Sequence, residues 1–131
     1  MDTHFNKVKE YLLELDYMIV SQNPAEGVFL VEKEDAGIKN LVIGCADPIL
    51  IMEQFICEIG QTTVDTYKNL LIKNRDIIHG AFVLDETGKN LMFRDTLQLE
   101  NLDLNELAGS LNSLSLLMSE YSDILIKISK K

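Results

Sequence analysis

His79 and Asp95 are the two side chains of this sequence that could take part together in acid–base chemistry. A histidine acts as a general base when a carboxylate orients its imidazole, and His79 stands at the start of an expected strand. Asp95 shares the otherwise apolar face of another expected strand, where its carboxylate must bond to a backbone donor or to a ligand. No third group accompanies this pair at a recognisable spacing, so the sequence favours structural roles over catalysis at both positions.

The cysteines and the acid-rich segments do not form a metal-binding pattern. Eleven residues separate Cys45 from Cys57, whereas a zinc site needs thiolates and imidazoles clustered at short spacing. Both cysteines lie in apolar runs, so we expect buried thiols that form no disulfide. A calcium loop needs a glycine and a terminal glutamate at fixed positions, which the acidic segments lack. We expect turns and a helix cap at these segments, which are residues 34–35, 85–86 and 103–106.

No short motif of a common enzyme class occurs in the chain. The sequence contains no G-x-x-x-x-G-K-[ST], no G-x-G-x-x-G and no G-x-S-x-G. These motifs would cradle a phosphate group or present a nucleophilic serine. We therefore expect a protein that is not an enzyme and that uses neither a cofactor nor a metal ion.

The composition predicts one acidic domain. At 131 residues and 47% hydrophobic content the chain has about the length of one ordinary domain, so we expect a single domain over residues 1–131. Twenty-one acids against twelve bases give a net charge of −9, which would repel a nucleic-acid backbone over most of the surface. The acids are spread along the chain and indicate a solvated surface, with a docking field for a basic partner as the second interpretation.

The sequence contains no recognisable membrane or secretion signal. Residues 1–7 lack a cationic start followed by an apolar core, and the longest apolar runs, such as residues 49–52, are too short to span a bilayer. We therefore expect a cytoplasmic protein with no membrane partner.

Hydrophobic periodicity predicts the elements that would position these side chains. Apolar residues at helical spacing predict an amphipathic helix over residues 3–15. A second helix is expected after a cap at Thr62 or Thr63 and should end near residues 74–76. Short apolar runs bounded by turn residues predict strands over residues 17–21, 28–31, 38–43 and 49–57.

The last third of the chain has the strongest pattern. Two apolar runs, residues 81–84 and 90–93, flank a polar turn in which Gly88 suits a positive φ, and this predicts a hairpin. Asp103, with Glu106 three residues later, has the capping-box arrangement, and leucines then recur every three or four residues. We expect one long final helix packed on the sheet, with a coiled-coil seam as the alternative.

The predicted fold class is α+β. The expected order is helix, three or four strands, helix, two strands, helix, or α-β-β-β(-β)-α-β-β-α. An antiparallel sheet of about five strands, built as a meander plus a hairpin, would pack with three helices.

Several expected strands are apolar on both faces, whereas a sheet with one face in water should alternate cleanly. Residues 28–31 and 49–52 are of this kind, and Leu116 projects from the back of the final helix. We therefore expect a second copy of the chain or a partner protein to cover the second face. The predicted contact residues are Phe29, Val31, Leu50, Met52 and Leu116.

The order of elements resembles the Tir-chaperone-like superfamily, which includes the small acidic chaperones of type III secretion and the YbjN-like proteins. The resemblance spans residues 5–128 and rests on element order, the hairpin sequence of residues 82–88 and the acid-capped, leucine-rich final helix. It implies an α+β homodimer without catalytic residues, which holds a segment of a client protein against apolar patches and strand edges. It assigns no functional residue, because the sequence contains no motif specific to the family.

Two functional hypotheses follow. The first is a non-enzymatic protein-binding module of chaperone or adaptor type, in a homodimer, with an unidentified client. The second is a small-molecule-binding or regulatory domain whose pocket lies between helix and sheet, with Asp95 or His79 as a polar anchor.

Overall fold

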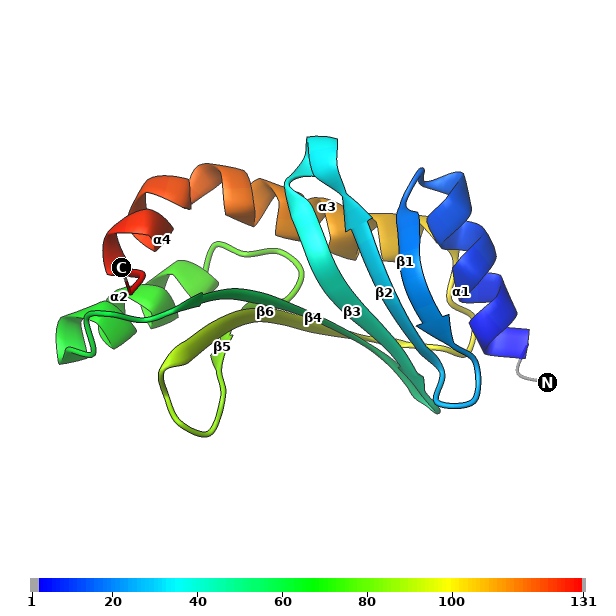
Figure 1. Ribbon diagram of the computed structural model, residues 1–131, viewed down its shortest axis with the longest axis horizontal. Helices are drawn as coiled ribbons and strands as arrows, with labels where there is room; N and C mark the ends of the chain where they lie inside the picture. The colour runs from blue at the N-terminus through cyan, green and yellow to red at the C-terminus, as the bar shows by residue number, and fades with distance from the viewer. Residues whose placement is uncertain (1–2, 131) are drawn as a thin grey trace.

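The chain forms a curved sheet with helices packed along it, and the computed structural model describes residues 3–130 (Figure 1). The helices are α1 (Thr3–Glu14), α2 (Val64–Asn74), α3 (Leu104–Glu120) and α4 (Ser122–Ile128), with a short 3-10 helix η1 (Glu34–Ala36). The strands are β1 (Met18–Asn23), β2 (Val28–Lys33), β3 (Ile38–Ala46), β4 (Ile49–Glu58), β5 (Ala81–Leu84) and β6 (Asn90–Gln98). None of the helices described is long and apolar enough to cross a bilayer.

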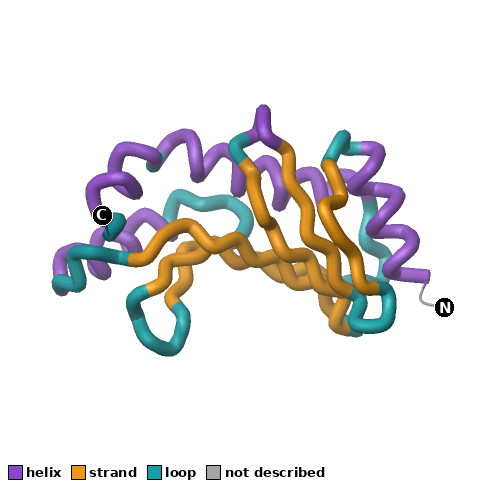
Figure 2. The backbone as a smooth tube through the Cα atoms, in the orientation of Figure 1, coloured by secondary structure: helices purple, strands orange, loops and turns teal. Residues whose placement is uncertain are grey.

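The six strands form one antiparallel sheet in the order β1-β2-β3-β4-β6-β5. Strands β1 to β4 make the predicted meander. Strand β6 then pairs along β4 from one end to the other, and the short strand β5 is left at the far edge. Figure 2 shows the strands as one continuous layer with the helices along it. The predicted α+β class is confirmed, and the sheet has six strands where about five were expected.

The expected single final helix is instead two helices, α3 and α4, which meet at Tyr121. Tyr121 has φ −104° and ψ 12°, outside the helical region, and the Ser122 hydroxyl donates to the Ser119 carbonyl at 3.3 Å. A side-chain donor that binds a helix carbonyl competes with the backbone hydrogen bonds and bends the helix. After the bend, the backbone of residues 128–130 hydrogen-bonds to that of residues 58–60 at the end of β4.

One face of the sheet carries the hydrophobic core. Along β4, Leu50 and Met52 are buried, whereas Phe55 is 54% exposed. Strand β6 alternates in the same way, with Leu91 and Phe93 buried. The buried positions pair across the strands and form one continuous apolar layer on this face.

Helix α1 covers the β1–β2 end of the core face. The helical periodicity predicted for this segment buries Phe5, Val8 and Leu12 on one side. The Phe5 ring stacks on the ring of Phe29 from β2, with ring centroids 4.2 Å apart. This aromatic pair joins the N-terminal helix to the sheet.

Helix α3 lies across the sheet and is tied by hydrogen bonds to β6 and to η1. Ser110, which is fully buried, donates a hydrogen bond to the Asp95 carboxylate on β6. The Ser115 hydroxyl donates to the Ala36 carbonyl at 2.7 Å. The predicted packing on the sheet is therefore confirmed against the coiled-coil alternative. The buried stripe of the helix is Leu107, Ser110, Leu111, Leu114 and Leu117.

Met52 and Phe55 lie on opposite faces of β4 and should respond differently to the same substitution. Met52→Glu would bury a carboxyl group in the apolar layer, so we expect the free energy of unfolding to fall by about 3 to 5 kcal/mol. Phe55→Glu alters an exposed side chain, and we expect a loss of no more than about 1 kcal/mol. Urea denaturation followed by circular dichroism measures both values, and equal losses would contradict the assignment of the core face.

The Ser110–Asp95 hydrogen bond should contribute measurably to the docking of α3. We expect Ser110→Ala to lower the free energy of unfolding by about 1 to 3 kcal/mol, because it removes the donor to a partly buried carboxylate. The double variant Ser110→Ala with Asp95→Ala should lose less free energy of unfolding than the sum of the losses of the two single variants, since either substitution alone breaks the pair. Ser119→Ala, at an exposed position of the same helix, is the control. Strictly additive losses in urea denaturation would show that the two side chains do not interact.

Candidate functional site

Four of the five predicted contact residues lie in the core. Phe29, Val31, Leu50 and Met52 are each 0% exposed, because their strands turn these side chains toward the helix layer. A partner cannot touch them in this fold, so they are corrected to core residues. Leu116 does remain accessible, with 54% of its surface exposed on the outer side of α3.

The opposite face of the sheet presents a second set of apolar side chains, which we call the open face. Helix α3 runs behind β2 and β3 in Figure 1 and leaves this face uncovered. Val42 is 42% exposed and Phe55 is 54% exposed. The strand register groups the apolar residues of the open face, which are Val28, Leu30, Val42, Ile49, Ile51, Phe55, Val83 and Met92.

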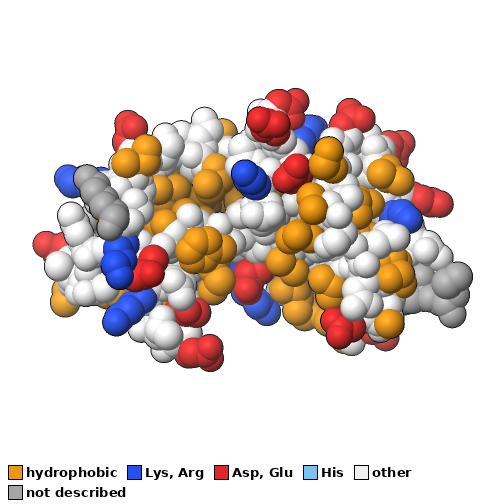
Figure 3. All heavy atoms as spheres, in the orientation of Figure 1, with side chains coloured by type: hydrophobic (Ala, Val, Ile, Leu, Met, Phe, Trp, Pro, Cys, Tyr) orange, Lys and Arg blue, Asp and Glu red, His pale blue; other side chains and the backbone are white. Residues whose placement is uncertain are grey.

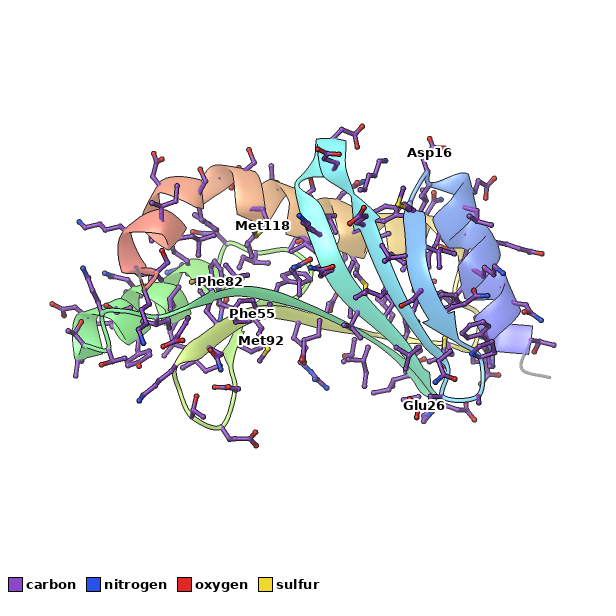
Figure 4. The ribbon with its side chains drawn as sticks, in the orientation of Figure 1. Asp16, Glu26, Phe55, Phe82, Met92 and Met118 are labelled. Carbon is purple, nitrogen blue, oxygen red and sulfur yellow. The ribbon has the colours of Figure 1, made fainter. Side chains whose placement is uncertain are left out.

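Cross-strand pairs organise the open face. Phe55 on β4 and Met92 on β6 lie side by side (Figure 4). The neighbouring pair on the same two strands is Glu53 and Arg94, whose side chains form an ion pair at 2.9 Å. Figure 3 shows hydrophobic side chains gathered over the strands in the right half of the view. The open face thus combines these apolar side chains with the exposed Glu53–Arg94 ion pair and with Thr96 and Gln98, which pair with Ile51 and Ile49 across β4 and β6.

The two edge strands of the sheet, β5 and β1, differ in how far other parts of the chain cover them. At the β5 edge, the Asn74 side chain of α2 accepts from the Phe82 N–H at 2.7 Å and donates to the Phe82 carbonyl at 3.1 Å. These bonds occupy the backbone groups that another strand would need. At the other edge, β1 is almost wholly exposed, with Met18 and Val20 at 61% and 48%. The outward backbone groups of Phe82 are thus occupied at the β5 edge, and β1 is the opposite edge strand of the sheet.

Helix α2 carries an apolar surface of its own, directed away from the core. Val64, Leu71 and Ile72 are 80%, 71% and 53% exposed, although the periodicity of this segment predicted a helix with an apolar packing side. We call this surface the α2 patch. Its lining residues surround a shallow hollow of about 600 Å³ and are Val64, Tyr67, Lys68, Leu71, Ile72 and Arg75.

His79 and Asp95 are not placed as a base and its orienting acid. Asp95 accepts hydrogen bonds from the Ser110 hydroxyl and, at 2.9 Å, from the Thr96 backbone N–H. The His79 carbonyl accepts from the Ser113 hydroxyl at 2.7 Å. Within residues 3–130, no hydrogen bond or ion pair joins the two side chains. The structural interpretation of Asp95 is confirmed, because its carboxylate bonds donors of this chain.

The cysteines form no disulfide, and both are half-buried where buried thiols were expected. Desolvation raises the pKa of the Cys57 thiol, so less of it is thiolate at neutral pH than for an exposed cysteine. Over the described part of the chain, no group of three or more His, Cys, Asp or Glu side chains is positioned to hold a metal ion.

The acid-rich segments form turns and a cap, as predicted. Residues 34–36 are η1, and Asp103 caps α3 by accepting from the Glu106 N–H at 2.8 Å. Asp85 closes the hairpin turn by accepting from the Thr87 hydroxyl at 2.6 Å and from the Asn90 amide at 2.6 Å. These hydrogen bonds lower the pKa of the Asp85 carboxyl to about 2.

The fold is similar to several solved structures. A chain of the HopA1–SchA chaperone–effector complex has a TM-score of 0.67 and 12% identity, over 94% of this chain and 98% of that chain. YbjN from E. coli has a TM-score of 0.64 and 12% identity, over 91% of each chain. The Yersinia pestis type III secretion chaperone SycH, solved with a fragment of YscM2, has a TM-score of 0.60 and 19% identity, over 97% of this chain and 100% of that chain.

One family model matches the sequence over its whole length. No protein of curated function matches the chain, whereas the model of the CesT_Tir_1 family matches residues 1–131. The folds compared above include that of the type III secretion chaperone SycH and that of YbjN, and they agree with the resemblance found in the order of elements. The chain belongs to the CesT_Tir_1 family.

Proposed function

We propose that this protein is a non-enzymatic chaperone or adaptor that acts as a homodimer and holds a segment of a client protein on its open face. Family membership supports a protein-binding role of chaperone type. The HopA1–SchA and SycH–YscM2 structures are each complexes of a chaperone with another protein. In this proposal residues 1–131 act as one domain in the cytoplasm and need no cofactor.

The observation that carries the proposal is the apolar character of the open face. Leu30 and Val42 pair across β2 and β3, and Phe55 and Met92 pair across β4 and β6. Removing apolar surface of this kind from water is worth about 25 cal/mol per Å². Exposed apolar patches on a folded protein mark surfaces that bind other proteins. A client segment that covers these side chains would gain this energy without altering the core.

The open edge of β1 supports an extended client segment. Its neighbour β2 is already paired on both sides, so β1 offers the free backbone groups at this end of the sheet. An added strand would use main-chain hydrogen bonds for affinity and side-chain pockets for specificity. The client would then continue from the edge onto the open face.

The α2 patch suits a second copy of the chain. Its apolar side chains lie on the helix that shields the β5 edge, away from β1, so dimerisation here would leave the client surface accessible. A two-fold axis would pack the patch against itself, as in most homodimers.

Charges placed on the open face should strongly weaken client binding. We expect Val42→Glu combined with Phe55→Glu to weaken the affinity for the client by about a hundredfold, since two carboxylates would lose water at an apolar contact. Affinity capture from native lysate at moderate and high salt, read by mass spectrometry, compares this variant with the wild type.

Ile126→Glu is the matched control, because Ile126 is 66% exposed on α4 and lies outside the open face. It should retain every partner of the wild type. Partners that survive the double substitution, or that the control loses equally, would contradict binding at the open face.

A charge on the α2 patch should separate the protomers. We expect Leu71→Glu to convert a dimer to a monomer, because it brings two carboxylates together across the two-fold axis. Light scattering coupled to size-exclusion chromatography measures the mass, and circular dichroism verifies the fold. If the wild-type protein is a monomer, or if Leu71→Glu leaves the dimer intact, the α2 patch is not the dimer interface.

A further inference from the structure

A groove between α3 and the segment before β5 lies outside the surfaces described so far. Residues 76–79 form one wall, and α3 with Tyr121 forms the other, around a cavity of about 230 Å³. Its apolar rim includes Ile78 and Leu116, which are 83% and 54% exposed. Helix α3 belongs to the helix layer, so this groove is separate from the open face.

The walls of the groove are held in place by the chain itself. The Ser113 hydroxyl donates to the His79 carbonyl oxygen at 2.7 Å, and the His79 backbone N–H donates to the Ser113 hydroxyl oxygen at 3.3 Å. A Cβ at Gly109 would lie 3.3 Å from His79 Nε2, so glycine leaves space for the imidazole against α3. Gly80 has φ +80°, and a Cβ there would clash with the Phe93 ring, so the loop needs glycine at this position. A preformed groove loses little entropy on binding.

The charged side chains at the groove are acidic. Asp76 and Glu120 line it and are exposed, and among the described residues no lysine or arginine lines it. Lys73 Nζ lies 5.8 Å from the centroid of the Tyr121 ring but outside the groove lining. Desolvation, and then the charges of Asp76 and Glu120, raise the pKa of Tyr121. Both carboxylates therefore lie within electrostatic range of one aromatic side chain of the groove.

We propose that this groove docks a segment of another protein that inserts a leucine-like side chain between Ile78 and Leu116 and pairs arginine or lysine side chains with Asp76 and Glu120. The apolar rim and the two carboxylates together match a segment that alternates aliphatic and basic residues. The cavity of about 230 Å³ is smaller than the roughly 300–1,000 Å³ of most small-molecule sites, which favours side chains of a docked segment.

The local charge of the groove decides between a second copy and another protein as its occupant. The groove is lined by Asp76 and Glu120, so a symmetric contact with a second copy would bring like charges together there, whereas a basic partner would be attracted. The α2 patch differs, because its charged lining residues are Lys68 and Arg75. The proposal adds a second partner surface to the client surface of the proposed function, and it stands on different residues.

The test uses a synthetic peptide that alternates leucine and arginine, and a matched peptide with glutamate in place of every arginine. Both are titrated into the full-length protein and followed by amide chemical shifts. We expect the arginine peptide to shift the amides of residues 76–79, Gly109, Ser113 and Leu116, and the glutamate peptide to bind at least tenfold more weakly. Exposed ion pairs strengthen binding by about two- to fivefold each, so Asp76→Asn with Glu120→Gln should weaken the arginine peptide by about tenfold.

Two control variants distinguish this groove from general attraction to an acidic protein. Glu106→Gln with Asp123→Asn makes the same change in net charge at exposed acids outside the groove, and should weaken binding by less than about twofold. Leu116→Ser should weaken binding, and Ile126→Ser should not. Equal losses from the two acid pairs, or shifts that map to other residues, would overturn the proposal. Native spectra of each variant exclude loss of fold as the cause.

Discussion

The structure depends on a mismatch between a sheet that carries apolar side chains on both faces and a set of helices that covers only one of them. Helices α1 and α3 bury the side chains of one face, through the Phe5–Phe29 stack and the leucines of α3. The strand period of two then sends Val42, Phe55 and Met92 to the other face, because a strand cannot direct successive side chains to the same side. The uncovered apolar surface is therefore a consequence of how this core is closed.

The connections that close the core also decide which other surfaces stay accessible. Asn74 bonds both backbone groups of Phe82, so α2 protects the β5 edge and turns its own apolar stripe outward. The bend at Tyr121 lets the chain after α4 return to the end of β4. The Asn74–Phe82 hydrogen bonds lie outside the open face, but because they occupy the β5 edge they leave β1 as the accessible edge of the sheet.

The sequence predicts the helices and strands well, but it does not predict well which face of each strand is buried. The helical periodicity of α1, the polar turn at Gly88 and the cap at Asp103 are local signals, and the structure confirms each of them. In the run from Ile49 to Met52 every residue is apolar, so no local signal separates the buried Leu50 and Met52 from Ile49 and Ile51. A usable signal lies on β6, where the polar residues Arg94, Thr96 and Gln98 alternate with Phe93, Asp95 and Leu97, and two of these three inner residues are apolar. Once β6 pairs with β4, this alternation identifies the outer face. That pairing joins distant segments, and periodicity alone does not predict it.

The most direct test of the open face is site-specific photo-crosslinking in the producing cells. p-Benzoylphenylalanine replaces Phe55 in one strain and Ile126 in another, and the crosslinked products are identified by mass spectrometry. If the open face holds a client, position 55 will crosslink to a discrete segment of another protein and position 126 will not. Crosslinks from position 55 to a second copy of this chain, or a yield equal to that of position 126, would contradict the central claim that this face binds a client.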